Sequence, residues 1–161
     1  MQAHRLALEE VAQQPFKLIA IHSHIEEYKL AFILNKNLNL RLTRTRTDVD
    51  LHTKSGQSFF SLYAYKDLLH YCTYYLVSNR SNSRGTTTAV ENTLFENEFT
   101  LTPAHLLPEL KKVDFFLKVE GETEAILKKP YLRYLNSIPQ ISTAYGIDKS
   151  QIKSEENLIF D

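Results

Sequence analysis

Two stretches of the sequence repeat one order of patterns, and this repetition limits the fold more than any other feature. Residues 16–47 contain an apolar run, a segment with helical spacing and a segment with β-branched residues at alternate positions. Residues 113–145 contain an alternating apolar stretch, a second segment of roughly helical spacing and a short strand pattern. A period of two is typical of strands, and apolar spacings of three and four are typical of helices. Each stretch is therefore predicted to form a β-α-β unit.

The helix of the first unit is predicted to begin at Ser23. Ser23 and Glu26 have the spacing of a capping box, in which each side chain accepts a hydrogen bond from the backbone amide at the other position. The helix is expected to end at residues 35–37, because asparagine tolerates the left-handed conformation found at helix ends. A strand is expected next, over residues 40–47.

The second unit contains one conflict, at Pro130. This proline falls within the predicted helix, 123–136, where it removes a backbone hydrogen bond and costs about 3 kcal/mol. The helix is therefore predicted to be kinked or split. On the strand before it, Val113 and Phe115 are expected to share the face that packs in the core.

Between the two units, residues 58–78 are rich in aromatic and β-branched side chains, which favour strands. Lys66 and Asp67 separate the two halves of this block, so we predict an antiparallel hairpin. Residues 79–88 lack apolar side chains and cannot bury surface to offset the entropy of ordering, so a mobile loop is expected there. Residues 148–161 form a polar tail that ends in a short apolar cluster.

These patterns predict one α+β domain spanning residues 1–161, with an antiparallel sheet and both helices on one face. The expected arrangement is an elaborated ferredoxin-like, or split βαβ, fold. The second unit also resembles the half-repeat of ACT-type regulatory domains, through its pattern alone. A chain of 161 residues that is 43% hydrophobic is long enough to bury a substantial core.

Charge and cysteine content restrict the partners and the compartment. The 19 basic and 19 acidic side chains cancel, so no overall field attracts phosphate backbones or anionic membranes, and we expect neither as a partner. The lone Cys72 cannot form an internal disulfide, and no apolar leader is visible at the N-terminus. A cytoplasmic location is therefore expected.

One motif resembles that of a named family. Residues 107–115 read LPELKKVDF, which is similar to the motif of the bacterial IPExxxVDY family, with leucine for the first isoleucine and phenylalanine for the final tyrosine. The resemblance continues through residues 21–24, 35–42 and 156–160, and so extends over nearly the whole chain. That family is named for its sequence and has no established activity. The resemblance therefore implies a family and no functional residues.

We interpret this motif as a structural joint. Pro108 fixes its own φ and favours an extended conformation for the residue before it, so the chain must run extended and then turn. Val113 then enters the sheet. Glu109 and Asp114 are expected to cap backbone amides or to pair with lysine or arginine at the bend.

The sequence contains no recognisable catalytic motif. With four glycines it offers no glycine-rich phosphate loop, and it contains no GxSxG or CxxC motif. Cys72 is interpreted as a buried packing thiol. His22 and His24 have a spacing that would suit a metal ion, but the capping-box interpretation favours a structural role. We therefore expect no catalytic residue, no metal and no cofactor.

The remaining candidates concern binding. Tyr63, Tyr65 and Tyr74 are the candidate partner-binding residues, because tyrosine is enriched at protein interfaces. A local basic patch beside these aromatic residues would suit single-stranded RNA. The patch would consist of Arg41, Arg44, Arg46, Arg80 and Arg84.

We expect a non-enzymatic protein-interaction or regulatory module, whose partner is another protein or a second copy of the chain. The alternatives are an ACT-like domain that senses a small ligand and an RNA-binding accessory protein.

Overall fold

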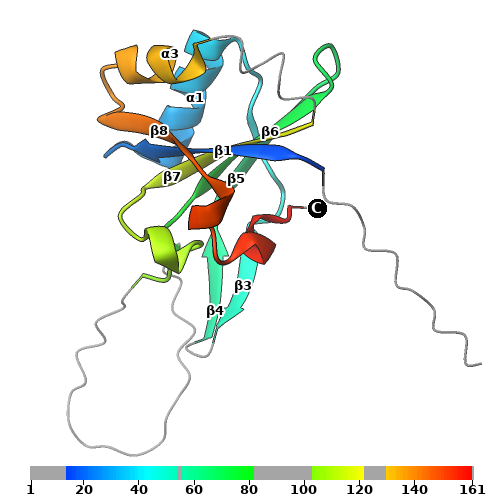
Figure 1. Cartoon of the computed structure of the whole chain (residues 1–161), viewed down its shortest axis with the longest axis vertical. Helices are drawn as coiled ribbons and strands as arrows, with labels where there is room; N and C mark the ends of the chain where they lie inside the picture. The colour runs from blue at the N-terminus through cyan, green and yellow to red at the C-terminus, as the bar shows by residue number, and fades with distance from the viewer. Residues whose placement is uncertain (1–13, 54–55, 82–102, 122–129, 161) are drawn as a thin grey trace, which may run out of the picture.

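The computed structural model describes residues 14–53, 56–81, 103–121 and 130–160 (Figure 1). Within these four ranges, no helix has the length and apolar character that a membrane span requires. The elements follow in this order: β1 (Phe16–His22), α1 (Glu27–Leu38), β2 (Thr43–Arg44), β3 (Val49–Thr53), β4 (Gly56–Phe60), β5 (Leu62–Asp67), β6 (Cys72–Ser78), η1 (Pro108–Leu110), β7 (Phe115–Gly121), α3 (Tyr131–Ser137), β8 (Thr143–Ile147), η2 (Lys149–Gln151) and η3 (Glu155–Leu158).

The structure is built on a six-stranded antiparallel sheet, which confirms the predicted α+β class. Its strand order is β2-β5-β6-β7-β1-β8, and β3 and β4 form a separate two-stranded hairpin. β1 pairs with β7 in a register that joins Phe16 to Glu120 and Ile21 to Phe115. The expectation that these two strands share one sheet is therefore confirmed.

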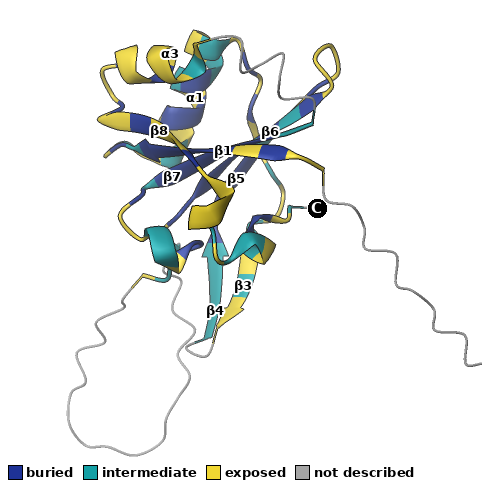
Figure 2. Cartoon of the chain, viewed as in Figure 1, coloured by how far each residue is buried: buried dark blue, intermediate teal, exposed yellow. Residues whose placement is uncertain are grey.

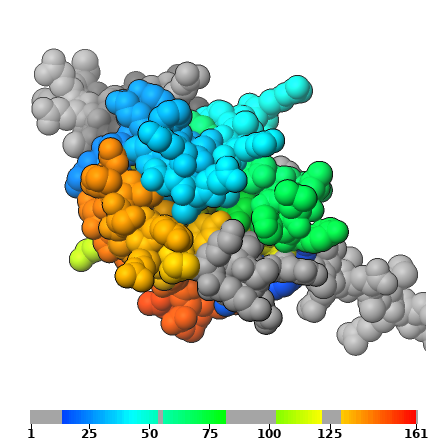
Figure 3. All heavy atoms as spheres, turned by 90° about the horizontal axis from the view of Figure 1, so that it is seen from above, coloured from blue at the N-terminus to red at the C-terminus, as the bar shows by residue number. Residues whose placement is uncertain are grey.

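Both faces of the central strands are buried (Figure 2). Successive side chains of a strand point to opposite faces, so Leu117 and Phe116 lie on different sides of β7, and both are fully buried. The Leu117 side packs with Leu30 of α1 and Leu135 of α3, so both helices cover the same face. Seen from above, the two helical segments lie side by side over the sheet (Figure 3).

The other face is covered by the β3–β4 hairpin, the segment around η1 and the end of the chain. Leu158 of the C-terminal segment is fully buried there, and Phe160 packs on the ring of Tyr75 at 5.2 Å. Ile159 points away and is half exposed. The apolar cluster at the chain end therefore contributes to a second core.

A buried lysine joins this C-terminal segment to the sheet. The side chain of Lys118 on β7 is 4% exposed, and its Nζ donates to the carbonyl oxygen of Leu158 at 2.6 Å and to the carboxylate of Glu120. The ammonium group also lies over the rings of Phe16 and Phe160, at 4.8 and 5.1 Å. A buried charge is costly unless it is paired, so docking of the chain end satisfies Lys118.

The predicted capping box at Ser23 is wrong. Helix α1 begins at Glu27, and its N-cap residue, Glu26, makes no side-chain cap bond. The hydroxyl of Ser23 donates instead to the carbonyl oxygen of Gln140, 117 residues away, at 2.7 Å. The left-handed asparagine at the end of α1 is Asn39, with φ 54° and ψ 42°, rather than a residue of 35–37. A tertiary contact therefore replaces the local cap.

Several boundaries also differ from the prediction. The strand expected over 40–47 is reduced to Thr43–Arg44, and the β3–β4 hairpin was not predicted. Helix α3 begins directly after Pro130, which is its N-cap, so the proline begins this helix. The earlier half of the predicted helix, and residues 82–88 of the predicted loop, lie outside the described residues.

Val113 does not share a face with Phe115 as expected. It precedes β7 and packs in the second core, with Phe116, while Phe115 packs under the helices. The chain has not yet entered the strand at Val113, so the alternation of β7 does not extend to it. The strand pattern read from residue 113 therefore begins two residues too early.

We predict that Lys118→Met lowers the free energy of unfolding by about 1–3 kcal/mol, because the carbonyl of Leu158 then lacks its donor. Lys17→Met, at an exposed position on β1, is the matched control and should change stability by less than about 0.5 kcal/mol. Urea unfolding of the two variants measures the difference. Equal stabilities would show that Lys118 does not anchor the chain end.

Candidate functional site

The turn between β5 and β6 carries a cluster of exposed apolar side chains. Leu68, Leu69 and Tyr71 are 73%, 86% and 76% exposed. Single exposed apolar residues are common, but a group of three within one short turn forms a patch of the kind found at interaction sites. The turn projects from the top of the molecule in Figure 1 and appears as an exposed loop in Figure 2.

Asp67 holds this turn in one conformation. Its Oδ1 accepts hydrogen bonds from the backbone amides of Leu69 and His70, at 3.0 and 3.2 Å, and its Oδ2 accepts from Nδ1 of His70 at 2.7 Å. Burial acts to raise the pKa of Asp67, but these hydrogen bonds, led by that of the His70 side chain, outweigh it and lower the pKa. The carboxylate therefore stays ionised and fixes the turn.

Tyr71 has a backbone conformation that is rare for a bulky residue. Its φ is 51°, in the left-handed region that glycine and asparagine prefer. Gly121, opposite on β7, has a φ of 110°, and a Cβ atom there would lie 2.3 Å from the carbonyl oxygen of Tyr71. The end of β7 approaches the turn this closely because residue 121 is glycine.

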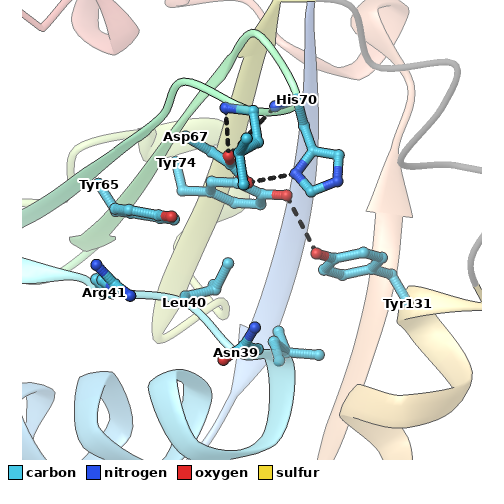
Figure 4. A pocket seen from close by; sticks show the side chains of 10 residues that line it. Asn39, Leu40, Arg41, Tyr65, Asp67, His70, Tyr74 and Tyr131 are labelled. Carbon is cyan, nitrogen blue, oxygen red and sulfur yellow. Dashed lines mark hydrogen bonds and ion pairs between the residues drawn. The ribbon is translucent and has the colours of Figure 1, made fainter.

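A hollow of about 180 Å³ lies beside the turn (Figure 4). Its walls come from the turn, from the end of α1 and the segment after it, from β5 and β6, and from the start of α3. In Figure 4, Arg41 and Tyr65 lie on one side of the hollow, and His70 and Tyr131 lie on the other. The lining residues are Leu38, Asn39, Leu40, Arg41, Tyr65, Asp67, Leu69, His70, Tyr74 and Tyr131.

Two tyrosines form a hydrogen-bonded pair at this hollow. The hydroxyl oxygens of Tyr74 and Tyr131 are 3.1 Å apart, and the ring of Tyr65 stacks on that of Tyr74 with centroids 6.0 Å apart. Burial raises the pKa of both Tyr74 and Tyr131, and it also raises the pKa of Cys72. The phenols and the thiol are therefore neutral, and they can donate hydrogen bonds rather than act as nucleophiles.

The structure places two of the three predicted partner-binding tyrosines at this hollow. Tyr65 and Tyr74 line it, whereas Tyr63 lies apart, beneath the guanidinium of Arg44 at 5.6 Å. Tyr63 and Tyr74 are buried in the core under the helices, so they offer little side-chain surface to a partner. Their role in partner binding stays a prediction.

No local pattern distinguishes the exposed turn residues from strand residues in the sequence.

The carboxylates of the LPELKKVDF segment contact three distant parts of the chain. Glu109 accepts hydrogen bonds from the backbone amides of Lys153 and Ser154, at 2.7 and 2.8 Å. Asp114 accepts from the amide of Ser23 at 3.0 Å and lies 3.4 Å from the guanidinium of Arg80. Both carboxylates therefore cap backbone amides around the bend that follows Pro108.

Asn79 binds the same segment from within, and nothing in the sequence indicates this role. It directly follows β6 and is completely buried, although the sequence placed it at the start of a mobile loop. It makes two hydrogen bonds through its backbone and three through its side-chain amide. The partners are Leu106, Leu107, Leu110, Val113 and Asp114.

His22 and His24, the two histidines whose spacing would suit a metal ion, have different surroundings. His22 bonds and stacks with Tyr145, with 3.1 Å between its Nε2 and the phenol oxygen, and His24 is exposed. In the described part of the chain, no three His, Cys, Asp or Glu side chains gather in a group able to hold a metal ion.

The predicted basic patch is likewise dispersed over the described residues. Arg41 lines the hollow, Arg44 and Arg46 line a separate groove, and Arg80 pairs with Asp114. Arg84 lies outside the described residues.

Comparison of the chain with protein-family models, with curated proteins and with solved structures gave no match. The resemblance of residues 107–115 to the IPExxxVDY motif therefore stays a prediction.

We predict that Asn79→Ala lowers the free energy of unfolding by about 2 kcal/mol or more, because the buried amide of Leu107 and the carbonyl of Val113 lose their hydrogen bonds to its side chain. Asn37→Ala, which removes one exposed hydrogen bond to Ile33, is the control and should cost less than about 0.5 kcal/mol. Urea denaturation measures both. A cost for Asn79→Ala as small as the control's would contradict the assigned role.

Proposed function

We propose that the protein is a non-enzymatic protein-binding module that contacts its partner through the β5–β6 turn. The observation that carries this proposal is the conformation of Tyr71, which is 76% exposed and has a φ of 51°. Unfavourable backbone conformations cost about 1–3 kcal/mol and cluster at functional sites. Because the ring of Tyr71 is exposed, its burial within the chain does not offset the free-energy cost of this backbone conformation. A partner that covered the ring would offset that cost.

The rigidity of the turn supports the proposal. Because Asp67 already fixes the backbone, a partner loses little free energy in ordering the turn when it binds. Tyrosine and leucine side chains presented in this way offer a large apolar contact area. Tyrosine is also among the residues that contribute most to binding at interfaces. The partner surface is therefore expected to be apolar, with a recess for the ring of Tyr71.

The protonation states around the turn support binding rather than catalysis. Burial keeps the thiol of Cys72 and the phenols of Tyr74 and Tyr131 protonated, so none of the three is an activated nucleophile. His70, the histidine beside them, is engaged with Asp67 in holding the turn. These four side chains therefore shape the turn and its surroundings and form hydrogen bonds there.

We also infer that the sheet is an elaborated ferredoxin-like arrangement. The order β8-β1-β7-β6, with α1 after β1 and α3 after β7, supports this inference. In such a fold, the segments from β2 to β5 are an addition between the first helix and its return strand. This addition supplies half of the β5–β6 turn, so the proposed binding surface belongs to the elaboration.

We predict that Leu68→Ser combined with Leu69→Ser removes partner binding and leaves the fold intact, since both side chains are exposed. Affinity capture from native cytoplasm and sedimentation velocity of the pure chain test binding to other proteins and to a second copy. Ile159→Ser, an exposed apolar residue on the opposite side of the sheet, is the matched control. A protein retained by the wild type and by the control, but lost with the double variant, supports the proposal. The absence of any turn-dependent partner or self-association contradicts it.

A further inference from the structure

We propose that the hollow beside the turn binds a small monocarboxylate with a compact apolar body, with Arg41 holding the carboxylate and the tyrosine rings enclosing the body. This small-ligand site adjoins the surface proposed to contact a protein and shares Leu69 with it, but it does not depend on that proposal. It is carried by the charge, the hydrogen-bond donors, the size and the rigidity of the lining.

The unpaired charge at the hollow is positive. Arg41 is exposed and makes no ion pair with any described residue, whereas Asp67, the one carboxylate in the lining, is bonded to His70 and to two backbone amides. A guanidinium group binds a carboxylate through two parallel hydrogen bonds. An anion is therefore favoured next to Arg41, and the nearby Asp67 disfavours a dianion such as phosphate.

The tyrosine pair leaves one hydrogen atom for a ligand. Tyr74 and Tyr131 are both neutral, so each hydroxyl carries a hydrogen, but the 3.1 Å contact between their oxygens uses only one. Either hydroxyl can be the donor in this contact. When Tyr74 donates to Tyr131, the hydroxyl of Tyr131 is free to donate to an oxygen in the hollow. A bound carboxylate would select this direction.

The size and walls of the hollow limit the ligand further. The hollow, at about 180 Å³, is smaller than the pockets of about 300–1,000 Å³ that hold drug-sized ligands, so it suits a small organic acid. Leu38, Leu69 and the rings of Tyr65 and Tyr131 supply much of the wall. Apolar and aromatic walls together with a single guanidinium match a molecule that has one charged end and a flat or compact apolar body.

The segment that carries Arg41 is already held in place. Asn39 turns the chain out of α1 with a φ of 54°, and the side-chain amide of Asn35 bonds both the amide and the carbonyl of Leu42, at 2.8 and 3.0 Å. The backbone of Arg41 is thus fixed on both sides while its side chain stays free. A ligand therefore finds a preformed site and orders a single long side chain.

The test uses the full chain and four probes: benzoate, acetate, benzyl alcohol and inorganic phosphate. Isothermal titration should give measurable binding of benzoate, and the other three probes should bind at least about tenfold more weakly. Acetate lacks the apolar body, benzyl alcohol lacks the negative charge, and phosphate lacks the apolar body and can carry a second negative charge. Absence of benzoate binding at millimolar concentration, or equal binding of benzyl alcohol, overturns the proposal.

Variants then locate the site. Arg41→Gln should weaken benzoate binding by about tenfold or more, and Tyr131→Phe should weaken it by a smaller factor. Arg46→Gln, which changes an exposed arginine in the separate groove, should leave it unchanged. Leu68→Ser should also retain benzoate binding, because Leu68 does not line the hollow. Failure of the protein-binding proposal can therefore be distinguished from failure of this ligand-binding proposal. Equal binding by Arg41→Gln and the wild type would place the ligand elsewhere and overturn the assignment.

Discussion

The hydrogen bonds of the buried Asn79 side chain connect the end of β6 to the segment that leads into β7, 28–34 residues further along the chain. They hold the segment before β7 against the end of β6, and through it they position Glu109 on the C-terminal segment and Asp114 on Ser23. This segment lies where the chain returns to the sheet and leads into β7. Without the side-chain amide, the buried amide of Leu107 and the carbonyl of Val113 would lose their hydrogen bonds, at a cost of about 1–3 kcal/mol each.

A sheet that is covered on both faces leaves few surfaces for function. The helices occupy one face, and the β3–β4 hairpin and the chain end occupy the other. The outer edge of β8 cannot pair with a further strand at Ala144, because the side chain of Asn136 bonds both the amide and the carbonyl of that residue. The β5–β6 turn extends beyond these layers, which explains why exposed apolar side chains and a rare backbone conformation coincide there.

The sequence predicts the parts of this structure that depend on local patterns. An apolar run indicated β1 and alternation indicated β7, and the break at Pro130 agrees with the start of α3. The parts that depend on distant contacts could not be predicted. The hydroxyl of Ser23 fits a local cap equally well until Gln140 lies beside it, and Asn79 looks like a loop residue until it is buried. The hollow combines side chains from six separate elements and segments, so no motif marks it.

The central claim is that Tyr71 keeps an unfavourable backbone conformation for the sake of binding. Tyr71→Asn tests it most directly, because asparagine tolerates the left-handed region and the exposed ring makes little packing contribution. Urea unfolding and partner capture, measured on the same variant, should change in opposite directions. The account predicts a gain in the free energy of unfolding of up to about 1 kcal/mol together with loss of the partner. A variant that is less stable, or that binds as the wild type does, would contradict it.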